Sequence, residues 1–106
     1  MNITAVNTLE VRVIDDVDSR FESHLREYAT RFEKSHGCVS YSLNRSASEP
    51  SLWVFSGCWS AVPAMTAHFE SGPMIELVNH LMECCANLTF ASFTPSIRET
   101  ATDETS

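Results

Sequence analysis

The sequence is poor in basic residues. Its 106 residues include seven Lys or Arg against 14 Asp or Glu, a net charge of −7. Nucleic acids and anionic membranes are bound through clustered Lys and Arg, so this shortage argues against both as partners. No apolar run reaches the roughly 18 residues that a membrane span needs, and residues 1–7 lack the segments of a signal peptide. We therefore expect a cytoplasmic protein.

Several chemical signatures are also missing. No glycine-rich phosphate loop, carboxylate pair or Ser/His/Asp arrangement is visible. The cysteines form no Cys-x-x-Cys pair, which argues against a zinc site, and in a cytoplasmic protein they should be thiols. They are Cys38, Cys58, Cys84 and Cys85. Asp15, Asp16 and Asp18 are better explained by helix capping than by a metal. We predict no metal and no cofactor.

The length is that of one domain. Hydrophobic residues make up 43% of the chain and charged residues 20%, as in an ordinary soluble globular domain. Residues 96–106 are polar and contain no aromatic side chain. We assign residues 1–95 to the domain and 96–106 to a tail without fixed structure.

Hydrophobic periodicity predicts four strands and two helices, the second helix in two pieces. Gly72-Pro73 marks the break, because proline favours a first helical turn. The order is that of the ferredoxin-like α+β fold, β-α-β-β-α-β, with a four-stranded antiparallel sheet and the helices on one face. The predicted elements are Thr4–Ile14, Ser19–Ser35, Cys38–Asn44, Leu52–Trp59, Ala61–Phe69 with Pro73–Cys85, and Asn87–Thr94.

The short loop between the second and third strands predicts an antiparallel hairpin. If aromatic residues of both strands share one face, paired residue numbers have an even sum. The loop length favours a sum of about 96, which pairs Tyr41 with Phe55 and Leu43 with Trp53. The same register places Cys38 opposite Cys58, as neighbouring thiols and not a disulfide.

The other face of the predicted sheet carries few charges. A sheet face in water normally shows Lys, Glu or Arg, so we expect a second copy to cover this one in a homodimer. Glu10 and Arg12 are exceptions, and we expect them to pair across that interface. The uncharged residues are Ser40, Ser42, Val54, Ser56 and Cys58.

Two segments resemble a known family. His36-Gly-Cys-Val-Ser-Tyr41 is similar to a Pro-Gly-Cys-x-x-Tyr motif, and a second motif is Trp59-Ser-x-x-x-Ala64-x-x-x-His68-x-x-Ser71. With the element order, they resemble the antibiotic biosynthesis monooxygenase family over about residues 7–93. The resemblance implies a homodimeric α+β barrel with a pocket between sheet and helices. Family members include cofactor-free monooxygenases, haem-degrading enzymes and sugar isomerases, so the resemblance does not fix the reaction.

Three residues are catalytic candidates. His68 has an ordinary pKa near 6.5, which suits proton transfer at neutral pH. Trp59 offers a flat ring for stacking and an N–H donor. Asn7 lies in an Asn-x-Leu context similar to a substrate-orienting asparagine of the haem-degrading branch. For each of the three, structural packing is the alternative.

Five aromatic residues are candidates for lining a substrate pocket, although such stripes usually form a core. They are Tyr28, Phe32, Tyr41, Trp53 and Phe55. A buried Tyr41 hydroxyl would need a hydrogen-bond partner.

The leading hypothesis is a cofactor-independent monooxygenase that oxidises a small phenolic, quinol or polyketide-like aromatic with dioxygen. The second is a non-enzymatic dimeric module that binds a small molecule. A haem-binding or haem-degrading protein is the third, but the position of the family's iron ligand is occupied by Val78. His80 lies two residues away, about 200° around a helix.

Overall fold

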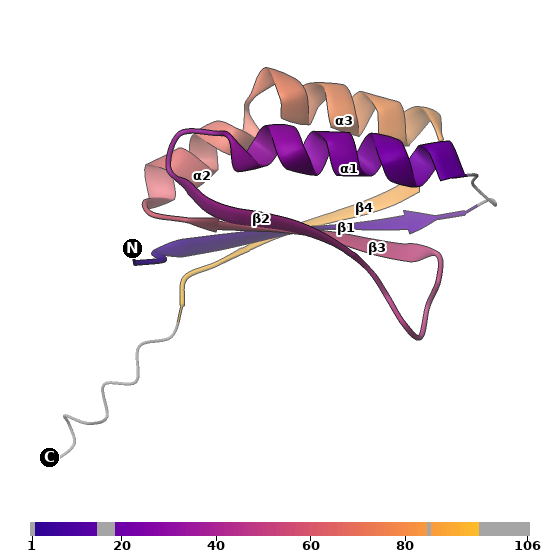
Figure 1. The fold of residues 1–106 in the computed structure, drawn as a ribbon, viewed down its shortest axis with the longest axis horizontal. Helices are drawn as coiled ribbons and strands as arrows, with labels where there is room; N and C mark the ends of the chain where they lie inside the picture. Colours follow the sequence, from indigo (N-terminus) through magenta and orange to yellow (C-terminus); the bar gives the residue numbers. More distant parts are fainter. Residues whose placement is uncertain (1, 15–18, 85, 96–106) are drawn as a thin grey trace, which may run out of the picture.

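The computed structural model describes residues 2–14, 19–84 and 86–95 of the chain. Its elements are β1 (Ala5–Val13), α1 (Ser19–Glu33), β2 (Cys38–Arg45), β3 (Leu52–Trp59), α2 (Val62–Phe69), α3 (Gly72–Glu83) and β4 (Ala86–Phe93). All strand pairs are antiparallel, in the order β2-β3-β1-β4. The three helices lie on one face of the sheet (Figure 1). The predicted ferredoxin-like α+β fold is therefore confirmed.

The core lies between the sheet and the helices. Strand β3 alternates strictly, with Trp53, Phe55 and Trp59 buried toward the helices. Helix α1 buries Phe21, Leu25 and Phe32 against them, as the sequence spacing predicts. This apolar layer fixes the orientation of every strand that carries a candidate site residue.

The opposite face of the sheet faces away from all three helices (Figure 1). Val54, Ser56 and Cys58 lie there half-buried, while Ser40 and Ser42 are exposed. Phe93, paired with Val6 at the edge of this face, is 54% exposed. Within the described ranges no element covers this face, and its burial by a second copy stays a prediction.

The predicted hairpin register is wrong by two residues. Tyr41 pairs with Gly57, and Leu43 pairs with Phe55. Ser46 still belongs to the ladder, because its N–H donates to the Leu52 carbonyl at 2.8 Å. The turn is therefore centred one residue later than expected. Because the shift is even, the side chains from Ser40 to Asn44 keep their predicted faces.

The predicted Cys38–Cys58 pair is also wrong. A β-bulge between Cys38 and Ser40 pairs Cys38 with Trp59 and Ser40 with Cys58. Both thiols are free, as predicted. Burial, the Glu33 carboxylate and the Cys58 thiol raise the pKa of Cys38.

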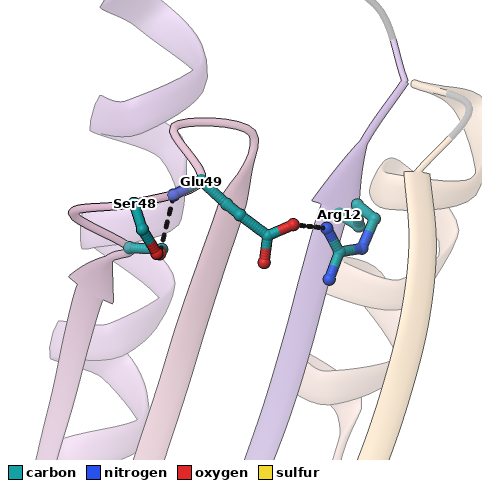
Figure 2. A network of polar contacts seen from close by, with 4 residues as sticks. Arg12, Ser48 and Glu49 are labelled. Atoms are coloured by element: carbon teal, nitrogen blue, oxygen red, sulfur yellow. Dashed lines mark hydrogen bonds and ion pairs between the residues drawn. The ribbon is translucent and has the colours of Figure 1, made fainter.

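The loop between β2 and β3 is attached to β1 by an ion pair. The Arg12 guanidinium donates to Glu49 at 2.6 Å (Figure 2). Arg12 was expected to pair across a dimer interface, and here its partner belongs to its own chain. Within the loop, the backbone N–H of Glu49 donates to Ser46 Oγ at 3.0 Å.

Helix ends differ slightly from the prediction. Helix α1 ends at Glu33, two residues early, and Gly37 lies in the following turn with a φ of +84°, a conformation that favours glycine. No helix of the described residues is long and apolar enough to cross a membrane. The predicted caps Asp15, Asp16 and Asp18, together with Cys85 and residues 96–106, lie outside the described part of the chain.

Candidate functional site

Helix α2 is docked onto the sheet by two small residues of the family-like motifs. A Cβ added to Gly37 would lie 2.5 Å from the Cβ of Ala64, so this contact requires glycine. The Gly37 carbonyl also accepts from the backbone N–H of Ser60 at 2.9 Å and from its hydroxyl at 3.2 Å. These contacts hold the start of α2 beside the start of β2.

Ser71 fixes the break between α2 and α3. Its hydroxyl donates to the His68 carbonyl at 2.8 Å and accepts from the Met74 N–H at 3.3 Å, so it caps α3. Pro73 occupies the first turn of α3, as predicted. The motif serine thereby positions the last turn of α2, which carries His68.

Four polar side chains form one buried chain of hydrogen bonds. Trp59 Nε1 donates to Asn7 Oδ1 at 2.7 Å, and Asn7 Nδ2 donates to the Tyr41 hydroxyl at 3.2 Å. The Tyr41 hydroxyl lies 2.7 Å from His68 Nε2. The exposed fractions are 0% for Asn7 and Trp59, 3% for His68 and 8% for Tyr41. We call this set the polar chain.

Gly57 makes the polar chain geometrically feasible. Across the sheet it stands between Tyr41 on β2 and Asn7 on β1. A Cβ at this position would lie 2.5 Å from both Asn7 Oδ1 and Tyr41 Cε2. Because Gly57 has no side chain, Asn7 and Tyr41 form a direct hydrogen bond across β3. The sequence signal for this role is a glycine inside an aromatic strand face, a known sign of close approach, and Gly57 was not among the predicted site residues.

Burial determines the charge state of the polar chain. It lowers the pKa of His68 from 6.5 to about 4 and raises the pKa of Tyr41. The imidazole is therefore neutral and the phenol protonated at neutral pH. The described structure gives His68 Nδ1 no hydrogen-bond partner, although this atom is buried.

The five predicted pocket aromatics all lie in or against the core. Phe32 and Phe55 are almost fully buried, and Tyr28 packs at the edge of the same cluster. Trp53 is buried with its Nε1 unpaired, and the Arg45 guanidinium lies 4.9 Å from its ring centroid. Only Tyr41 joins the polar chain, and its hydroxyl has the partners that a buried tyrosine needs.

The candidate binding space lies beside the polar chain. A groove of about 360 Å³ is lined by Phe69, Phe90, Ala91 and Ser92. We call it the edge groove, because it lies at the outer strand β4. Phe69 follows His68 in α2, and Ser92 pairs with Asn7 in the sheet. Sequence analysis did not single out these groove residues, and only their tertiary placement reveals them.

His80 lies away from the polar chain. Its ring centroid is 5.3 Å from that of His24, and its Nε2 is 4.0 Å from Cys84 Sγ. Val78 packs against the core cluster instead. Within the described ranges no three His, Cys, Asp or Glu side chains are grouped to hold a metal ion.

Comparison with solved structures shows the same fold in bacterial and archaeal proteins. SnoaB of Streptomyces nogalater, a cofactor-independent oxygenase, is 17% identical, with a TM-score of 0.73 over 89% of this chain and 95% of that one. A conserved protein of Methanosarcina mazei is 16% identical, with a TM-score of 0.75 over 89% and 95%. Rv0793 of Mycobacterium tuberculosis is 19% identical, with a TM-score of 0.73 over 89% and 97%.

No curated protein sequence matches this chain. The sequence profile of the family described as antibiotic biosynthesis monooxygenase, however, matches residues 3–79. That segment contains all four residues of the polar chain, and it covers more than half of the protein. The chain belongs to the antibiotic biosynthesis monooxygenase family.

Proposed function

We propose that this protein is a cofactor-independent monooxygenase acting on a small phenolic, quinol or polyketide-like aromatic. The observation that carries the proposal is the polar chain, which brings His68, Trp59 and Asn7 together beside the edge groove. Family membership and the fold shared with SnoaB support the same class of reaction.

The reaction needs only the substrate and dioxygen. A phenolate transfers one electron to O₂, and the resulting aryloxyl radical and superoxide combine at the ring carbon para to the oxygen. The peroxide takes up a proton, and loss of the ring hydrogen with cleavage of the O–O bond gives a quinone and water. One oxygen atom of O₂ enters the product, and the other leaves as water. The four-electron demand of O₂ is met by the substrate alone.

The protein binds the substrate, orients it and supplies hydrogen bonds to its oxygen. The edge groove is lined by Phe69 and Phe90, which pack edge-to-face with their centroids 6.0 Å apart and give a flat ring an aromatic wall to stack on. In this proposal Trp59 and Asn7 form the buried end of the site, and His68 hydrogen-bonds the substrate oxygen; their mutual hydrogen bonds support it.

Oxygen uptake with a panel of phenols, hydroquinones and polyketide-type aromatics tests the proposal. We expect consumption of O₂, formation of a quinone and one labelled oxygen in the product when ¹⁸O₂ is supplied. His68→Ala should lower the rate at least about 100-fold, the usual effect of removing one hydrogen-bond donor to a developing oxyanion. His24→Ala removes an exposed imidazole and should leave the rate unchanged. No uptake with any compound, or full activity in His68→Ala, would refute the proposal.

One observation favours the second function, a small-molecule binding module without catalysis. The polar chain is closely packed, and its His68 ring lies 4.6 Å from Phe32 and 4.8 Å from Trp59 between centroids. Tryptophan fluorescence distinguishes the two functions. Ligand-dependent quenching without any O₂ uptake supports the binding module.

We also propose that the face of the sheet opposite the helices packs against a second copy of this protein. Its support is the uncharged surface of β2 and β3 together with the exposed Phe93. Sedimentation equilibrium should give a dimer, and Val54→Lys should shift it toward monomer. A monomeric wild-type protein at high concentration would exclude this assembly.

A further inference from the structure

The hydrogen bonds of the polar chain have a definite direction. An indole N–H only donates, so the Asn7 oxygen faces Trp59 and the amide nitrogen faces Tyr41. An amide nitrogen also only donates, so the Tyr41 oxygen accepts from it. The Tyr41 oxygen could also accept from His68 Nε2–H, but the phenolic hydrogen would then have no acceptor among the described residues. We therefore assign that hydrogen to His68 Nε2, 2.7 Å away.

This direction fixes the tautomer of His68. If Nε2 accepts from Tyr41, the neutral imidazole carries its hydrogen on Nδ1. That Nδ1–H is buried and has no partner in the described structure. Leaving a buried donor unpaired costs its full desolvation penalty, so native proteins rarely retain one without a reason.

The ring of Phe69 lies between the His68 imidazole and the edge groove, because it contacts the imidazole and lines the groove. The imidazole contacts four aromatic rings, of which Phe69 has its centroid 5.9 Å away. Phe69 in turn contacts Phe90, and both line the groove. Tyr41 is the titratable group that contacts the imidazole. Burial lowers the pKa of His68, and no carboxylate contributes to that shift.

We propose that His68 Nδ1–H is the hydrogen-bond donor for an anionic oxygen of the ligand, and that Tyr41 is the positioning residue that fixes this tautomer. The ligand class is a flat aromatic hydroxyl compound that is already ionised at neutral pH, such as a hydroxyquinone or an enolised diketone. The link to oxidation rests on the proposed function, whereas the binding role does not.

The geometry is unfavourable for the opposite role, in which His68 removes a proton from the substrate. The nitrogen that accepts a proton is already bonded to Tyr41. A neutral imidazole whose pKa is about 4 is also a weak base toward an ordinary phenol with a pKa of about 10. A substrate that arrives as an anion needs no base, and the donor stabilises its charge without any proton transfer.

Nitrogen NMR of the full chain labelled with ¹⁵N-histidine tests the tautomer directly. Multiple-bond correlation spectra of His68, assigned by its absence in His68→Gln, should show a protonated Nδ1 and an unprotonated Nε2. In Tyr41→Phe the preference should relax toward a mixture or toward Nε2–H. A wild-type His68 protonated on Nε2 would overturn the inference without reference to any variant or activity.

Ligand binding gives the second test. We expect 2-hydroxy-1,4-naphthoquinone, an anion at neutral pH, to bind at least about tenfold more tightly than neutral 1-naphthol, a difference of about 1.4 kcal/mol. His68→Phe keeps a ring but loses the donor, and should abolish this preference. His24→Ala should keep it. Equal affinity of the wild type for both probes would contradict the proposal.

The two proposals fail in different ways. Preferential binding of the anion without oxygen uptake leaves the donor role intact and removes the monooxygenase. Oxidation of neutral phenols at the same kcat/KM as ionised ones supports the monooxygenase and refutes the donor role.

Discussion

The two ends of β1 carry polar interactions of opposite kinds. Near its start, Asn7 is completely buried and joins neutral groups from β2, β3 and α2. Near its end, Arg12 is exposed and forms an ion pair with Glu49 at 2.6 Å. The Arg12–Glu49 contact is shorter and charged, yet it contributes less to stability, because water solvates the two charged groups almost as well when they are apart. Burial, not charge or distance, makes a polar contact structurally important here.

Replacing Asn7 with leucine should have the largest effect on stability, because it removes the buried hydrogen bonds near the start of β1. Leucine has a similar size, but it leaves the Trp59 N–H buried without an acceptor and removes the donor to Tyr41. We expect the free energy of unfolding to fall by about 4 kcal/mol. Urea unfolding measures this change, with Asn87→Leu on the exposed surface of β4 as the matched control. A loss no greater than that of the control would show that the polar chain is not structural.

Acid should have the next largest effect. The pKa of His68 is about 4 in the folded protein and about 6.5 when unfolded, so the unfolded chain binds more protons between these values. Stability should therefore be complete above pH 6.5 and fall as the pH decreases toward 4, by about 3 kcal/mol from this residue. The measurement is urea unfolding of the wild type and His68→Gln across this range. Parallel curves would contradict the buried neutral imidazole, while His24→Gln should follow the wild type.

Removing the exposed ion pair should have the smallest effect. Glu49→Gln abolishes the charge on one side, yet both Arg12 and Glu49 are solvated at the surface. We expect the urea midpoint to stay within experimental error and to be insensitive to added salt. A shift as large as that of Asn7→Leu would reverse the ranking of the two regions.

The fold could be predicted because its signals are local. The alternation of Leu9, Val11 and Val13 marks β1, and the strict alternation of β3 fixes which side chains face the helices. The hairpin register could not be predicted, because the position of its turn depends on backbone hydrogen bonds, such as that from Ser46 to Leu52, that no residue type indicates. A register error of two residues leaves the side chains from Ser40 to Asn44 on their predicted faces, but it changes the residue that each of them pairs with.

The candidate site shows the same division. Trp59, Asn7 and His68 could be selected by residue type, and Tyr41 could be identified as needing a partner. Their connection could not, because the bond from Tyr41 to His68 depends on how α2 docks on the sheet. That docking involves Gly37 against Ala64, a contact between residues 27 apart that sequence spacing does not show.

The polar chain is also a one-way series of dipoles. Each group donates toward the next, from Trp59 through Asn7 and Tyr41 to His68. Bonds aligned in this manner polarise one another, each strengthening its successor. The electron density on the imidazole, and with it the acidity of the Nδ1 hydrogen, thus depends on an indole three bonds away. If the direction of any one of these hydrogen bonds were reversed, its dipole would oppose those of the others and weaken them.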